Sequence, residues 1–484
     1  MLAYQQSDRA NVSEPEFSCA EQFRGVRCKV MLVNYDRRTL AGVTAAVVTT
    51  AAFAKMFLPF YLIGSTAIFA ATALLGAALI ATDWRPLYDM AGKVTGTVLL
   101  LGLLYAWVVI NFLLLSRPAV PTTHLLGILI FHALFMIFGF AAARALNVFL
   151  MTLLGGAAIY VIVIVHYTIR FGDLQAGGYL HDIFGIGEPA VSVTFHQNMG
   201  ILFGLAALAA LGLATNRITR ILAIGALPIV LLFMFHISAR AGLVGLVCSL
   251  VFWIGANLWL RSRRLTLLAV FAAAVAVALA SNAFYQRALQ DKDVDAVAPD
   301  AISRTIREIQ DPRPLFRLQI WQRTWHQIAT EPDRLPFGRG IGMFPVNEGF
   351  GAPDWLLRKT EGSKYYPHNV HLEMLYEAGI AGLLLFGLVT LFPLASSLTY
   401  WHLFSLAEKS VASMYVFYLI GSALSGAFAF QFLYWFFFAL AVGTIAMKRM
   451  EGAAAADRPS DSRADVDGTA RLSSGTASVT NSPV

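Results

Sequence analysis

The chain has 484 residues, of which 57% are hydrophobic and 13% charged, and its formal net charge is +7. Soluble domains carry about 25% charged residues, so this composition argues against an ordinary soluble protein and indicates a membrane protein. The long apolar runs favour helices over a β-barrel, whose strands would alternate polar and apolar residues. Most basic residues fall in short loops, where they set topology rather than bind nucleic acid.

Apolar runs predict an all-α, polytopic integral membrane protein with about twelve transmembrane helices and one large polar insert, which the family resemblance described below makes periplasmic. The first segment, 1–39, is polar and basic and is expected in the cytoplasm. Nine spans are expected within 40–284, at 40–58, 60–81, 94–116, 123–143, 146–169, 194–214, 220–238, 241–260 and 265–284. The insert is 285–370, and three further spans, 376–399, 411–430 and 432–448, lie within 371–450. Residues 451–484 are expected to form a disordered cytoplasmic tail.

Basic residues flank the predicted spans on one face of the membrane. They are Arg37, Arg38, Arg144, Arg217, Arg220, Arg261, Arg263, Arg264, Lys448 and Arg449. The positive-inside rule makes that face cytoplasmic, so residues 170–192 and 285–370 are expected outside. The three cysteines, Cys19, Cys28 and Cys248, precede the first span or lie inside one, which argues against a disulfide framework or a zinc site.

An interfacial helix is predicted inside the insert, from Pro314 to about Ala329. Arg317, Trp321, Trp325 and Ile328 recur along it at helical spacing. Tryptophan suits the lipid headgroup layer, so Arg317 is expected at the height of lipid phosphates, with a snorkelling interfacial arginine as the plainer alternative.

A glycine-rich segment, Pro336–Gly342, follows this helix. Its backbone N–H groups could cradle a phosphate, but it has neither the Lys-Ser/Thr ending of a P-loop nor the strand of a dinucleotide site. A tight turn between helices is therefore the favoured interpretation. The residues Lys364 and Tyr365 lie beyond it and are predicted to bind substrate, although a solvated loop explains them equally well.

The run Pro367-His368-Asn369, followed by Gly379 and Gly382, stands where the insert gives way to an apolar span. This pattern resembles the signature of O-antigen ligases and the related O-antigen polymerases. Two further stretches resemble that family: Arg317 with Trp321 and the glycine-rich segment, and Ser238-Ala239-Arg240-Ala241-Gly242 at an outward helix end. The resemblance covers roughly residues 190–440.

The resemblance implies transfer of a glycan from undecaprenyl diphosphate at the periplasmic face of the bacterial inner membrane, by inverting chemistry without a metal or other cofactor. A ligase gives the glycan to the lipid A–core, and a polymerase gives it to another repeat unit. A neutral imidazole can take the proton of an attacking sugar hydroxyl, and arginines can stabilise a departing diphosphate. These roles are assigned to His368 as base and to Arg240 and Arg317.

Substrate binding is predicted for Asn369, Arg339, Lys364, Tyr365, His196 and Lys55. The alternative for all of them is a polar residue at a membrane interface, and for Asn369 a helix cap. Gly379 and Gly382 are expected to allow close helix packing.

Other functions compete with the ligase. Asp293-Val294-Asp295 matches the Asp-x-Asp of metal-dependent glycosyltransferases, and His368 with His371 could be two metal ligands, but each pattern is short and lacks a partner. A protein O-oligosaccharyltransferase would use the same donor. A transporter or lipid flippase would also have many spans, but it should place substrate residues at mid-membrane.

Overall fold

The computed structural model describes residues 38–50, 65–171, 189–236, 239–266, 317–348 and 366–456, together with positions 283, 286 and 306. Every regular element in these ranges is a helix, so the all-α expectation is confirmed. A helical stretch at 38–50 comes first. The remaining elements are α2 (Ser65–Lys93), α3 (Thr95–Asn111), the π-helix η1 (Phe112–Ser116), α4 (Thr122–Arg144), α5 (Leu146–Phe171), α7 (Pro189–Leu213), α8 (Arg217–His236), α9 (Arg240–Arg261), α12 (Arg317–Thr330), the 3₁₀-helix η2 (Pro332–Arg334), α13 (Met343–Glu348), α15 (Val370–Tyr400), α16 (Leu406–Ser425) and α17 (Phe432–Ala456).

Within the described residues, six helical segments are long and apolar enough to cross a membrane. They are Thr95–Ser116, Thr122–Arg144, Arg217–Phe235, Arg240–Arg261, Val370–Tyr400 and Phe432–Ala454. A polytopic membrane protein is thereby confirmed, while a total of twelve spans stays a prediction. The span expected at 60–81 is part of a longer helix, because α2 continues through Pro86 to Lys93.

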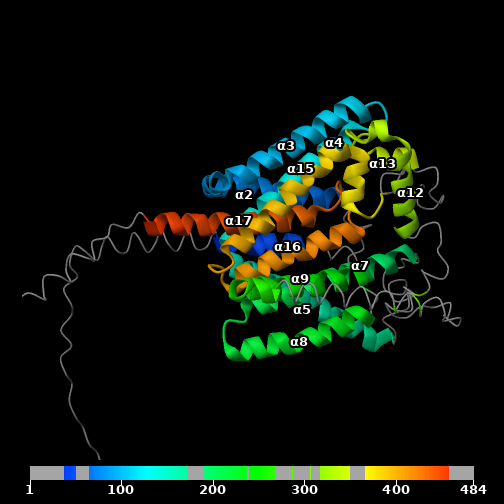
Figure 1. Cartoon of the computed structure of the whole chain (residues 1–484). Helices are drawn as coiled ribbons and strands as arrows, with labels where there is room; N and C mark the ends of the chain where they lie inside the picture. Colours follow the sequence, from blue (N-terminus) through cyan, green and yellow to red (C-terminus); the bar gives the residue numbers. More distant parts are fainter. Residues whose placement is uncertain are drawn as a thin grey trace, which may run out of the picture.

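The helices form a bundle in which α17 packs along α4 and α16 packs against α7 and α9 (Figure 1). Trp435 and Phe436 of α17 are almost wholly buried at its centre. On α8, by contrast, apolar side chains such as Ile229 and Leu232 are largely exposed. An apolar outer surface of this kind is what lipid requires of a spanning helix.

A sharp break at Gly379 divides α15 into two helices. Gly379 has φ 71° and ψ −170°, which no residue inside a helix adopts. The rings of His371 and Phe386 lie 5.6 Å apart, whereas in a straight helix fifteen residues would separate them by about 22 Å. The segment Val370–Ala378 therefore folds back against the segment that follows the break.

This folded-back segment is part of a cap, defined as residues 317–348 and 366–378, which covers one end of the bundle (Figure 1). The cap has a small apolar core of its own, formed by Ile320, Ile328, Phe344 and Tyr376. The span expected at 376–399 thus begins within the cap, and only the part after Gly379 continues into the bundle.

Candidate active site

His368 lies immediately before the first helix turn of α15. Its φ of 56° is positive, which is uncommon for a residue with a side chain and is worth attention at a candidate site. The next residue, Asn369, is the N-cap: its side-chain oxygen accepts from the backbone N–H groups of His371 and Leu372, both at 3.0 Å. The helix-cap alternative for Asn369 is therefore what the structure contains.

The imidazole of His368 is held against one aromatic ring. The ring of Tyr366 lies 4.3 Å from it, centroid to centroid. Nδ1 of His368 is buried and has no partner among the described residues, while the residue as a whole is partly exposed. Nε2 is therefore the ring nitrogen that a substrate can reach.

Burial, helped by the positive charge of Arg317, lowers the pKa of His368 to about 4. Both effects disfavour the charged imidazolium. At neutral pH the imidazole is consequently uncharged, with a lone pair on one nitrogen free to accept a proton. A general base must be in this state before the reaction begins.

Arg317 begins α12 and joins the cap to the end of α16. Its Nη1 donates to the carbonyl oxygen of Leu424 at 3.0 Å. The indole of Trp321, one turn along α12, donates to the carbonyl of Pro367 at 2.7 Å and so fastens the residue next to His368. Trp325, one turn further along α12, is 59% exposed, and the headgroup location expected for these tryptophans stays a prediction.

Arg240 is the first residue of α9 and is partly buried. α9 runs antiparallel to α16, since Gly245 packs on Phe417 and Asn257 lies against Lys409. The start of α9 is therefore level with the C-terminal end of α16, where Arg317 is bound. Arg240, Arg317 and His368 thus belong to the same end of the bundle.

The glycine-rich segment is a tight turn that binds the break in α15. The backbone N–H groups of Arg339 and Gly340 donate to the carbonyls of Tyr376 and Glu377, at 2.9 and 2.8 Å. The carboxylate of Glu377 in turn accepts from Gly342 at 2.8 Å and from Phe344 at 3.0 Å. The tight-turn interpretation is confirmed.

Asn111 of α3 holds the same turn from the other side. Its side chain accepts from the N–H of Ile341 at 3.0 Å and donates to the carbonyl of Phe337 at 2.6 Å. The N–H groups that would have cradled a phosphate are therefore already bound to protein acceptors, and the phosphate-cradle alternative is wrong. Neither Glu377 nor Asn111 was expected from the sequence, because each acts on residues distant along the chain.

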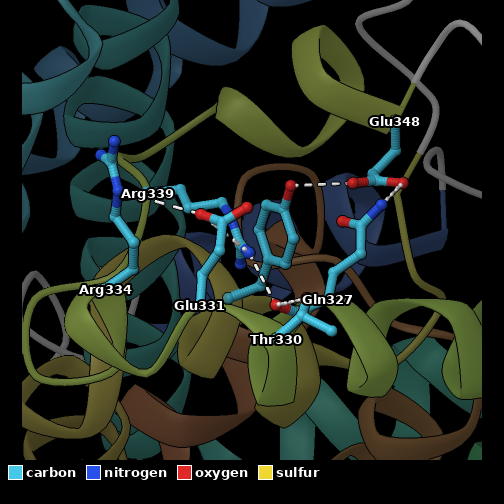
Figure 2. Close-up of polar contacts among 7 residues, drawn as sticks. Gln327, Thr330, Glu331, Arg334, Arg339 and Glu348 are labelled. Atoms are coloured by element: carbon cyan, nitrogen blue, oxygen red, sulfur yellow. Dashed lines mark hydrogen bonds and ion pairs between the residues drawn. The ribbon is translucent and has the colours of Figure 1, made fainter.

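Arg339 ties α12 to α15 (Figure 2). Its guanidinium donates to the carbonyl of Gln327 at 2.8 Å, lies 3.3 Å from the Glu331 carboxylate and stacks 4.5 Å over the ring of Tyr376. The residue is only 8% exposed. These contacts favour a structural role, and its binding of substrate stays a prediction.

A groove of about 320 Å³ lies on the cap and reaches Leu383 of α15, with Asn369, the neighbour of His368, in its lining. Its lining residues are Trp321, Trp325, Asn369, His371, Leu372, Leu375 and Leu383. Most of these side chains are apolar or aromatic, so the groove suits an uncharged part of a substrate rather than a diphosphate.

The side chains of the remaining candidate site residues lie outside the described part of the structure. Lys55, Lys364 and Tyr365 are outside the described residues, as are Asp293 and Asp295. The backbone of His196 belongs to α7, and its side chain is outside the description. Their predicted roles stay predictions.

Residues 225–387 match the family model described as O-Antigen ligase. This stretch contains Arg240, Arg317 and His368, and the match confirms the resemblance drawn from the sequence motifs. It supports a membrane enzyme of the O-antigen ligase or polymerase type, acting on lipid-linked glycans, without distinguishing the two. No curated protein matches the chain.

Proposed function

We propose that this protein is an O-antigen ligase, which transfers a glycan from undecaprenyl diphosphate to the lipid A–core oligosaccharide at the periplasmic face of the bacterial inner membrane. One observation carries the proposal: His368, whose Nδ1 is buried, and Arg317 belong to the same cap, close enough for the charge of the arginine to help lower the pKa of the imidazole. The match to the ligase family over the same residues supports it.

In this reaction the acceptor hydroxyl attacks the anomeric carbon while Nε2 of His368 takes its proton. The bond from that carbon to the diphosphate oxygen breaks, and the diphosphate leaves with the electron pair. Attack from the face opposite the leaving group inverts the anomeric centre. The imidazolium passes its proton to solvent afterwards.

The low pKa of free His368 suits a donor that carries negative charge. A bound diphosphate would neutralise the field of Arg317 and favour the imidazolium, which raises the pKa of His368 towards the working pH. Arg317 and Arg240 supply the positive charge that stabilises the departing diphosphate, a task guanidinium groups perform through paired N–H donors. This arrangement needs no metal.

The identity of the acceptor, lipid A–core or another repeat unit, distinguishes a ligase from a polymerase. A deletion strain that loses the lipopolysaccharide ladder, keeps an intact core and accumulates polymerised glycan on carrier lipid identifies a ligase. A core that carries a single repeat unit identifies the polymerase instead. Glycan missing from proteins, with normal lipopolysaccharide, identifies a protein O-oligosaccharyltransferase.

A transporter or flippase is the competitor from another class. Such a protein should hold its substrate near the middle of the bilayer, whereas Arg317 and His368 belong to the cap at one end of the bundle. Purified protein in vesicles, mixed with lipid-linked glycan and acceptor, should form the new glycolipid with EDTA present and without nucleotide or ion gradient. Movement of the donor between leaflets with no new glycolipid would favour the transporter.

A further inference from the structure

His368 has few restraints of its own. The backbone on each side is fixed, because the carbonyl of Pro367 accepts from Trp321 and Asn369 caps α15. Neither contact fixes the rotation of the imidazole. Nδ1 has no hydrogen-bond partner in the described part of the chain, so no hydrogen bond to this nitrogen sets the ring's direction there.

The ring of Tyr366 supplies the missing restraint. It lies 4.3 Å from the imidazole at an interplanar angle of 46°, and no other described ring pairs with His368. A buried aromatic pair at this separation contributes beyond the area that it removes from water.

We propose that Tyr366 is a positioning residue: its ring packs on the imidazole of His368, covers one side of it and leaves Nε2 open to the acceptor hydroxyl. The role in catalysis rests on the proposed function, whereas the positioning itself does not. The contact is carried by the ring and not by the phenol oxygen, so phenylalanine should replace tyrosine at this position.

Two charged groups near Tyr366 bear on the same site. Arg317, from α12, acts on both Tyr366 and His368, and Glu373, from α15, acts on Tyr366. Burial, with Glu373 adding to it, raises the pKa of Tyr366 to about 12, so its hydroxyl stays protonated at working pH. The tyrosine is thus an uncharged ring near both an arginine and a glutamate.

The first experiment measures His368 directly and needs no glycan. The full-length protein in lipid nanodiscs is treated with diethyl pyrocarbonate, which acylates neutral imidazoles, and modification of His368 is followed by mass spectrometry. Tyr366→Leu is expected to raise the modification rate several-fold, because it uncovers the ring. Tyr366→Phe is expected to keep the rate of the unaltered protein.

Tyr418 offers a matched control. It is a more deeply buried tyrosine than Tyr366, and its ring stacks 4.7 Å from that of Phe437 in α16 and α17, outside the cap. Tyr418→Leu removes a comparable contact and should leave the His368 rate unchanged. If Tyr366→Leu does not fold, Tyr366→Met makes the same comparison.

The second experiment measures glycolipid formation. In Tyr366→Leu, kcat should fall at least about tenfold, as for a misplaced general base, with KM for the lipid-linked donor unchanged. The acid limb of the pH profile should move to higher pH, because a less buried imidazole binds protons more readily. Tyr366→Phe should restore both.

Equal His368 reactivity in the unaltered protein and the leucine variant would overturn the positioning role. A phenylalanine variant as defective as the leucine variant would overturn it too, because it would assign the role to the hydroxyl. Absence of glycosyl transfer by the unaltered protein, together with the expected reactivity changes, would instead overturn the proposed function and leave the positioning intact.

Discussion

The backbones of Gly379 and Gly338 approach so closely that a Cβ added to Gly379 would lie 2.5 Å from the amide nitrogen of Gly338. The same Cβ would lie 2.5 Å from the carbonyl oxygen of Pro336. Both obstacles are backbone atoms, which cannot rotate away. The break in α15 and the turn that binds it therefore require glycine here, and the placement of His368 in the cap depends on both.

Gly379→Ala should accordingly loosen the cap and reduce activity. A side chain at φ 71° is strained, by about 1 kcal/mol or more, and the overlap with Gly338 adds to that cost. Gly387→Ala is the matched control, because a Cβ there meets no atom within 4 Å and alanine favours a helix. Thermal unfolding in detergent should show a lower midpoint for the first variant and an unchanged or higher one for the second.

His368→Gln should lower the rate of glycan transfer by about 10²–10⁴, because the amide cannot take the acceptor proton. Expression and unfolding temperature should stay close to normal, since Nδ1 makes no hydrogen bond in the described structure. His326→Gln, an exposed histidine on α12, should remain active. The lipopolysaccharide ladder of a deletion strain complemented with each variant measures the activity of both histidine variants. Full activity of His368→Gln would refute the assignment of His368 as the base.

Arg317→Gln should raise the pKa of His368. Removing a neighbouring positive charge favours the protonated imidazole, so the pKa moves up from about 4 while burial still holds it below 6.5, and the acid limb of His368 acylation moves with it. Transfer should also fall by about 10²–10³, from loss of a preorganised donor. Arg323→Gln changes an arginine of the same helix that pairs with Glu348 and is half exposed, and should leave the titration in place.

Arg339→Ala should destabilise the protein by about 1–3 kcal/mol, because it removes a buried guanidinium with a hydrogen bond and a ring contact. Arg334→Ala is its control: this side chain is 57% exposed and lies 3.9 Å from the same Glu331. An exposed ion pair contributes about 0–1 kcal/mol. Equal unfolding temperatures for the two variants would contradict the tie between α12 and α15 in Figure 2.

Helix positions were predictable because the signal is local. An apolar run of about 20 residues must satisfy its backbone internally in lipid, which dictates a helix whatever surrounds it. The run 123–143 became Thr122–Arg144, and 241–260 became Arg240–Arg261. The motif around His368 was readable in the same way, since its residues are neighbours in the chain.

The break in α15 could not be read from the sequence. The stretch around Gly379 stays apolar on both sides, and its positive φ is maintained by a turn about 40 residues earlier. For the same reason the glycine-rich segment could be read as a phosphate cradle until Glu377 and Asn111 were found on its N–H groups.

The sequence by itself thus determined an all-helical membrane protein and a resemblance to the O-antigen ligase and polymerase family, and it predicted a site formed by one histidine and two arginines. Only the tertiary structure decided which nitrogen of His368 is open, that Tyr366 covers the imidazole, and that the cap turns back at Gly379. The physical reason is the distance along the chain over which each interaction acts. Helix formation depends on hydrogen bonds four residues apart, whereas burial and ring contacts depend on how separate segments pack.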